Sequence, residues 1–117
     1  MLTAADFKER MVAFLDELIA QFPERSIILL AKTVVQNQHA TVIVEKFHQQ
    51  IFPLKDLIEQ RNSELLFQRG NNYIDDHTYK EILQQIELIW TSLDEANQSM
   101  IWEWFDSFLY ISNKLNT

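Results

Sequence analysis

The sequence predicts an all-α fold, a compact bundle of about five helices with a proline kink near residue 53 and an irregular loop at about residues 61–75. Apolar residues recur at spacings of three and four along most of the chain, as they do on one face of a helix. Capping residues stand where several of these stretches begin. The 117 residues include one Gly and two Pro, too few for the tight turns of a β-rich fold. This length fits a single domain spanning residues 1–117.

The first helix is predicted from Thr3 to about Gln21. Thr3 and Asp6 have capping-box spacing, and Asp6 also complements the positive end of the helix dipole. Pro23 cannot continue the helix, so we expect the helix to end near Gln21. The apolar residues of its inward face are Phe7, Met11, Phe14, Leu15, Leu18 and Phe22.

A second helix is predicted from Ser26 to about Gln36. Its β-branched content makes a buried strand the rival interpretation, but no second strand of comparable strength is present to pair with it. We therefore favour a helix capped by Ser26. The residues expected to face inward are Ile27, Leu30, Ala31 and Val34.

The middle of the chain is predicted to be less regular. A third helix covers about Ala40 to Phe52, and Pro53 removes a backbone donor, so the chain kinks or restarts there. Two further turns follow, up to about Gln60. The inward residues of this part are Ile43, Val44, Phe47, Ile51, Leu57 and Ile58.

Residues 61–74 show no clear periodicity and are expected to form a loop. Within it, Ser63 could cap a single turn, and Gly70 suits a left-handed helix end. Asn71 and Asn72 are typical turn residues. The apolar residues of this predicted loop are Leu65, Leu66, Phe67 and Tyr73.

Two helices are predicted to close the chain. Thr78 and Glu81 form a second capping-box pattern, and Asp94 caps a last helix that runs to about Lys114. The inward residues of the first are Tyr79, Ile82, Leu83, Ile86, Ile89, Trp90 and Leu93. Those of the second are Asn97, Met100, Ile101, Trp104, Phe105, Phe108, Ile111 and Leu115.

The composition excludes several classes of protein. With no Cys there is no disulfide, thiolate metal site or cysteine nucleophile, and one Gly cannot build a phosphate-binding loop. The net charge is −7, and residues 75–117 carry eight carboxylates against two lysines, so direct binding of nucleic acid is not expected. The longest apolar run, residues 27–31, is too short to span a membrane, and no leader pattern precedes it. We expect a cytoplasmic location.

One pair of side chains raises the possibility of metal chemistry. His77 and Glu81 are four residues apart on a predicted helix, with Asp75 and Asp76 close by, so they could offer two metal ligands on one face. The same residues also fit a capped helix start whose carboxylates complement the dipole, which is the interpretation we favour. We therefore expect no catalytic residue, no metal and no cofactor, and an enzyme is the minority hypothesis.

The last helix carries more apolar residues than one face requires. A second apolar stripe is predicted at Trp102 and Leu109, with Tyr110 on its flank. Such a helix is either central in its bundle or shared with a partner, and Trp and Tyr are enriched at binding hot spots. We expect a protein partner to cover this stripe. Residues that could extend the surface are Val12, Ile19 and Leu88, and the apolar loop around Leu66, Phe67 and Tyr73 is a second candidate surface.

Three stretches of the sequence carry a resemblance. They are W-x-x-L-D-E-x-N-x-x-M-I-W-x-W-F at residues 90–105, F-L-x-x-L followed by F-P-E at residues 14–24, and I-F-P-L-K at residues 51–55. Together they resemble short helical proteins of unknown activity encoded by large nucleocytoplasmic DNA viruses of algae and protists. The resemblance implies a virus-encoded, non-catalytic role and supplies no catalytic residue. For a viral protein, the expected location would be the host cytoplasm or a virion.

The sequence therefore predicts a protein-interaction or assembly subunit that contacts itself or a viral or host protein through its aromatic C-terminal helix. One alternative is a minor structural component associated with the capsid of a large DNA virus particle. A second alternative is a small metal-dependent enzyme built around His77 and Glu81.

Overall fold

A computed structural model describes residues 1–116, which form seven α-helices and one 3₁₀ helix and contain no β-strand. The helices are α1 (Ala4–Gln21), α2 (Ser26–Asn37), α3 (Ala40–Ile51), η1 (Phe52–Leu54), α4 (Lys55–Glu59), α5 (Ser63–Tyr73), α6 (His77–Trp90) and α7 (Glu95–Leu115). The all-α prediction is confirmed, with more helices than the five expected. The radius of gyration is 13.2 Å, as expected for a compact chain of about this length.

The two longest helices, α1 and α7, start where the sequence predicts. Thr3 and Asp6 make the capping box of α1: the Thr3 hydroxyl accepts from the Asp6 N–H at 3.2 Å, and Asp6 accepts from the Thr3 N–H at 2.9 Å. At the start of α7, the Asp94 carboxylate accepts from the N–H of Asn97 at 2.8 Å. Each cap satisfies a backbone donor that has no partner within its helix.

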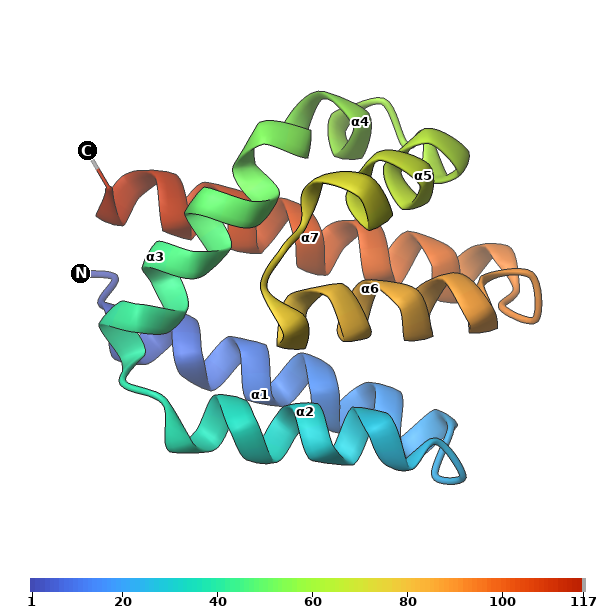
Figure 1. The fold of residues 1–117 in the computed structure, drawn as a ribbon, viewed down its shortest axis with the longest axis horizontal. Helices are drawn as coiled ribbons and strands as arrows, with labels where there is room; N and C mark the ends of the chain where they lie inside the picture. The colour runs from blue at the N-terminus through green and yellow to red at the C-terminus, as the bar shows by residue number, and fades with distance from the viewer. Residues whose placement is uncertain (117) are drawn as a thin grey trace.

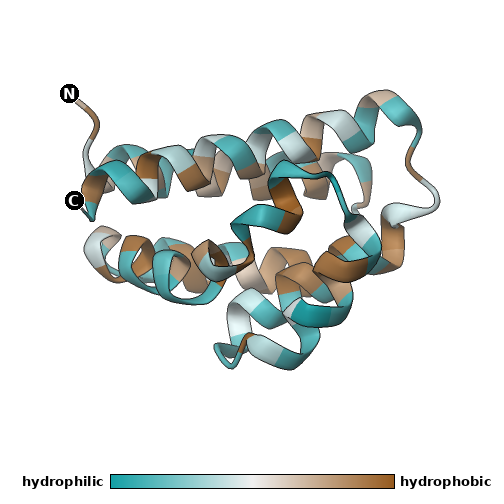
Figure 2. Cartoon of the chain, turned by 90° about the horizontal axis from the view of Figure 1, so that it is seen from above, coloured by the Kyte–Doolittle hydropathy of each residue, from teal (hydrophilic) through white to brown (hydrophobic). Residues whose placement is uncertain are grey.

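The helices pack in an arrangement that leaves α2 on the outside. Helices α1 and α2 lie side by side, α6 packs against α2, and α3 crosses the bundle to contact both α1 and α7 (Figure 1). Helices α4 and α5 cover α6 and α7 at the other edge, and the two ends of the chain lie at the same end of the molecule (Figure 1). Hydrophobic and hydrophilic residues alternate along the long helices, as in amphipathic helices generally (Figure 2).

The centre of the core is a cluster of phenylalanine rings. Phe108 of α7 packs against Phe7 and Phe14 of α1 and against Phe47 of α3, with ring centroids 5.5–5.8 Å apart. Edge-to-face and tilted pairs at these distances stabilise a core beyond the burial of their area. The cluster joins the N-terminal, central and C-terminal parts of the sequence.

Pro53 lies in η1, where the chain passes from α3 into α4. Proline has no N–H, so it cannot pair with the carbonyl of Gln49, four residues earlier. The Tyr73 hydroxyl donates to that carbonyl at 3.4 Å. A side chain from α5 thus contacts the backbone group that proline leaves without its usual helical partner.

The prediction of an irregular loop is wrong for residues Ser63–Tyr73, which form α5. Asn62 is the N-cap, and its side chain accepts from the N–H of Leu65 at 3.2 Å. The left-handed residue is Arg61, with φ of 55°, and not Gly70, which lies inside α5. An added Cβ at Gly70 would collide with the end of the Leu83 side chain, which would have to shift for α5 to pack as closely on α6.

The start of α6 also differs from the prediction. The N-cap is Asp76, whose carboxylate accepts from the Tyr79 N–H at 3.1 Å, and the Thr78–Glu81 pattern lies inside the helix. Gln50 of α3 holds the preceding turn: its side-chain oxygen accepts from the N–H of Asp75 at 2.8 Å and of Asp76 at 3.1 Å. This buried amide fixes the angle at which the chain enters α6.

Candidate functional site

The apolar stripe predicted on the last helix lies largely inside the molecule. Trp102 and Leu109 are only 7% and 8% exposed, so the expectation that they form an uncovered stripe is wrong. The Trp102 ring packs against Trp90, with centroids 5.3 Å apart, and the Arg61 guanidinium lies 5.5 Å from its centroid. Helix α7 is central in its bundle and buries both of its apolar sides within the chain.

The second predicted surface is also mostly internal. Leu66 and Phe67 are buried, and Phe67 packs edge-to-face against Trp90. Only Tyr73 is exposed, and its hydroxyl contacts the carbonyl of Gln49. Val12 and Ile19, expected to extend the surface on the first helix, are partly buried against the core.

Tyr110 is exposed, as predicted, and borders a groove between the η1–α4 segment and α7. The groove has a volume of about 230 Å³ and is lined by Phe52, Lys55, Glu59, Asp106, Leu109, Tyr110 and Asn113. Its charged groups are already paired within the chain. Lys55 pairs with Glu59 at 3.5 Å, and Asp106 forms a two-pronged pair with Arg61 at 2.6 and 2.9 Å. The groove therefore offers an outside partner few unpaired polar groups.

A different element carries the most extensive exposed apolar face. The outward side of α2 presents three side chains at helical spacing, Ile27, Leu30 and Val34, which are 36%, 62% and 39% exposed. The prediction that Ile27, Leu30 and Val34 face inward is therefore wrong. We call these three residues the α2 face. Leu29 is also exposed, at 53%, but lies about 100° around the helix from Leu30.

The core side of α2 is formed by another stripe. Ile28, Ala31 and Val35 are buried, at the same spacing of three and four but rotated around the helix. The predicted and the observed stripes share only Ala31. The small Ala31 side chain suits the close packing of α2 against its neighbours.

Polar contacts at both ends and in the middle of α2 hold this orientation. Lys32, its one charged residue, pairs with Asp16 of α1 at 2.6 Å. At its C-terminal end, Lys8 donates to the carbonyls of Gln36 at 2.9 Å and Gln38 at 2.8 Å. Because Lys32 is engaged on the α1 side, the α2 face carries no charge.

The start of α2 is tied to α6. The Arg25 guanidinium donates to the Gln85 side chain at 3.2 Å. Leu88, one helical turn beyond Gln85, is 62% exposed, which confirms its predicted place on the outer side of its helix. Leu88 is thus an exposed apolar residue on a helix that packs against α2.

The possible metal ligands do not assemble into a larger group. His77 Nε2 and Glu81 Oε1 are 3.2 Å apart, and the His77 side chain is 86% exposed. Within residues 1–116, no cluster of three or more His, Asp or Glu side chains could hold a metal ion. The pair forms an i, i+4 contact at the start of α6, as the capped-helix interpretation expects.

Two side chains have pKa values shifted by their surroundings. The hydrogen bond to Asp106 raises the pKa of Arg61 further. Burial raises the pKa of Tyr79 well above its ordinary value, and the Tyr79 hydroxyl donates to the Ile43 carbonyl at 3.1 Å. Both groups therefore keep their neutral-pH forms and stabilise the fold.

Comparison with protein-family models, curated proteins and solved structures finds no match to the chain. The resemblance to viral helical proteins stays a prediction from the motifs. None of the helices in the described part of the chain is long and apolar enough to cross a membrane.

Proposed function

We propose that this protein is a non-catalytic assembly subunit that associates with a second copy of itself through the α2 face. The observation that carries the proposal is the exposure of Ile27, Leu30 and Val34 on a helix face without charge. Clustered exposed apolar residues are typical of interaction sites, whereas single ones are ordinary. The α2 face replaces the aromatic C-terminal helix as the expected contact.

The charge of the chain supports a second copy as the partner. Each copy carries a net charge of −7, so most pairings of two surfaces would bring carboxylates together. The α2 face has no charged side chain to repel its counterpart. A contact through this face therefore avoids the electrostatic cost that the rest of an acidic surface would bring.

The spacing along α2 is also compatible with two-fold symmetry. When two copies of a helix pack antiparallel across a two-fold axis, each residue on one side of the centre meets one on the other side. Leu30 lies close to the midpoint between Ile27 and Val34. Such packing places Leu30 near the axis and Ile27 opposite Val34 of the second copy, so each apolar side chain finds an apolar neighbour.

The exposed area of these side chains determines how tightly two copies are expected to associate. Fully burying one Leu or Ile contributes about 1.5–3 kcal/mol, and the three residues of the α2 face are 36–62% exposed. Two copies together would gain on the order of 4–8 kcal/mol, against an association cost of about 4–15 kcal/mol. We expect a reversible dimer whose fraction rises with protein concentration.

The molar mass in solution tests the proposal. Light scattering at increasing concentration should approach twice the 13.9 kDa of one chain. Leu30→Glu should return the mass to that of one chain, because it places a carboxylate near its own symmetry mate. Tyr110→Glu is the matched control: Tyr110 is 60% exposed against 62% for Leu30, and its variant should still dimerise. A wild type that stays at the mass of one chain would refute the proposal.

A further inference from the structure

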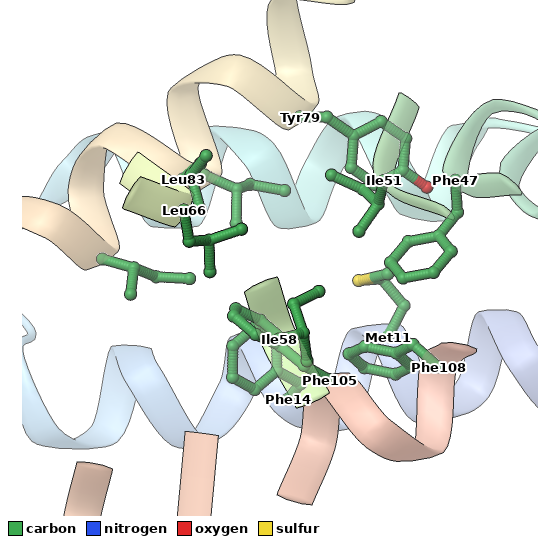
Figure 3. A pocket seen from close by; sticks show the side chains of 12 residues that line it. Met11, Phe14, Phe47, Ile51, Ile58, Leu66, Tyr79, Leu83, Phe105 and Phe108 are labelled. Carbon is green, nitrogen blue, oxygen red and sulfur yellow. The ribbon is translucent and has the colours of Figure 1, made fainter. Parts of the chain in front are cut away.

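The core contains an apolar cavity of about 40 Å³ that the fold leaves unfilled. Twelve side chains from α1, α3, α4, α5, α6 and α7 line it, and Figure 3 shows ten of them labelled around a common centre. Leu66 and Leu83 lie on one side, and Phe47 and Met11 on the other (Figure 3). Every long helix except α2 contributes to this lining.

The lining has no polar surface, so the cavity does not suit water. Its one polar side chain is Tyr79, and the Tyr79 hydroxyl is already engaged by the carbonyl of Ile43 at 3.1 Å. The volume exceeds the space that a single water requires, but a water needs two to four polar partners. Apolar cavities without such partners stay dry and bind apolar guests.

Rigid ring packing explains why the surrounding side chains do not collapse into the cavity. Phe108 is in contact with Phe14 at 5.7 Å and with Phe47 at 5.8 Å between ring centroids, and Phe14 also packs against Phe105 at 6.0 Å. These four rings all line the cavity. Moving one of them inward would break contacts with the others, and protein interiors resist such rearrangement.

We propose that this cavity is a binding site for a small uncharged apolar molecule, of the size of xenon or a light hydrocarbon. Such a guest restores the dispersion contacts that the lining atoms lack on the empty side. Eleven of the twelve lining residues are buried, and Ile51 is the one that is only partly buried. Ile51 is the last residue of α3, next to η1, and is the most exposed part of the lining.

Xenon is the probe that tests the proposal directly. Xenon-129 NMR of the wild type should show a saturable, fast-exchanging chemical shift change, and xenon pressure should raise the melting temperature. Leu66→Phe adds side-chain volume to the lining and should abolish both effects. Gln68→Phe introduces the same ring at an exposed position of the same helix, outside the cavity and the α2 face, and should preserve both.

A second filling variant keeps the test decisive. Ile58→Phe fills the cavity from α4. If Leu66→Phe does not fold, Ile58→Phe takes its place in the comparison with the wild type. The proposal is overturned if the wild type shows no saturable xenon effect, or if both folded filling variants bind xenon as the wild type does. The α2 face takes no part in the cavity, so this result is independent of the dimer.

Discussion

Replacing Trp102 with alanine distinguishes a core residue from a binding hot spot. The indole is 7% exposed and packs against Trp90 and Phe105, with centroids 5.3 and 6.1 Å apart. Removing a buried Trp costs about 3–5 kcal/mol in unfolding free energy. The loss includes the edge-to-face ring pairs, at about 0.5–1.5 kcal/mol each, and the contact with Arg61, at about 0.5–1 kcal/mol.

Urea unfolding followed by circular dichroism measures this loss. With a slope of about 1.5 kcal/mol per molar urea, Trp102→Ala should lower the midpoint by roughly 2–3 M. The control is Tyr110→Ala on the same helix, which is 60% exposed in the wild type and should change the free energy by about 0.5 kcal/mol. If the two variants have equal midpoints, Trp102 is not packed in the core and the description of α7 is wrong.

Three further changes test other contacts. Burial raises the pKa of Tyr79, so the unfolded state loses the tyrosine proton first as the pH rises. The free energy of unfolding of the wild type should therefore fall above about pH 10, by about 1.4 kcal/mol per pH unit. Tyr79→Phe should remove this slope in urea titrations across that range. Gln50→Ala should cost about 1–2 kcal/mol in urea unfolding, because two partly buried backbone N–H groups lose their acceptor, and an unchanged midpoint would contradict the bonds described. In α2, Ile28→Ala should lower the free energy of unfolding by about 2–4 kcal/mol and Leu30→Ala by less than about 1 kcal/mol in the same assay. A larger loss for Leu30→Ala than for Ile28→Ala would show that Leu30, and not Ile28, faces the core.

The parts of the fold that the sequence predicts are those with a local signal. The capping box of Thr3 and Asp6, the cap at Asp94 and the stop before Pro23 each act within a few residues of the chain. Their physical causes, backbone donors without partners and a missing N–H, do not depend on the rest of the molecule. The start and end of α1 and the start of α7 therefore follow from sequence alone.

Helix α5 lacks such a signal because its stability is tertiary. Gly70, Asn71 and Asn72 are weak helix formers, and this run of residues is typical of a turn. In the structure, Gly70 allows close contact with Leu83, and Asn71 donates to Glu87 at 3.0 Å. Both partners belong to α6, so the segment is helical because of packing that only the folded chain supplies.

The orientation of α2 could not be decided by periodicity. Both possible stripes have helical spacing, and the ordinary amphipathic rule turns Lys32 to solvent and Ile27, Leu30 and Val34 to the core. In the structure Ile28 and Val35 pack into the core instead, and Lys32 pairs with Asp16 of α1. Local rules of this kind tend to be violated at functional sites, which is why the exposed α2 face is the strongest candidate surface.

For Trp102 and Leu109, too, the sequence could not decide which side of the helix is buried: they were expected to be exposed and lie in the core. Their stripe is apolar enough to suit a partner or a central helix, and the sequence alone left these alternatives about equal. The structure places α7 in contact with α1, α3 and α4, so its second apolar side is covered by the chain itself.

The mass of the Leu30→Glu variant in solution, measured beside the wild type and Tyr110→Glu, tests self-association most directly. We expect the wild type and Tyr110→Glu to approach two chains at high concentration while Leu30→Glu stays at one. Equal masses for Leu30→Glu and the wild type, or a wild type that never exceeds one chain, would contradict the assignment of the α2 face.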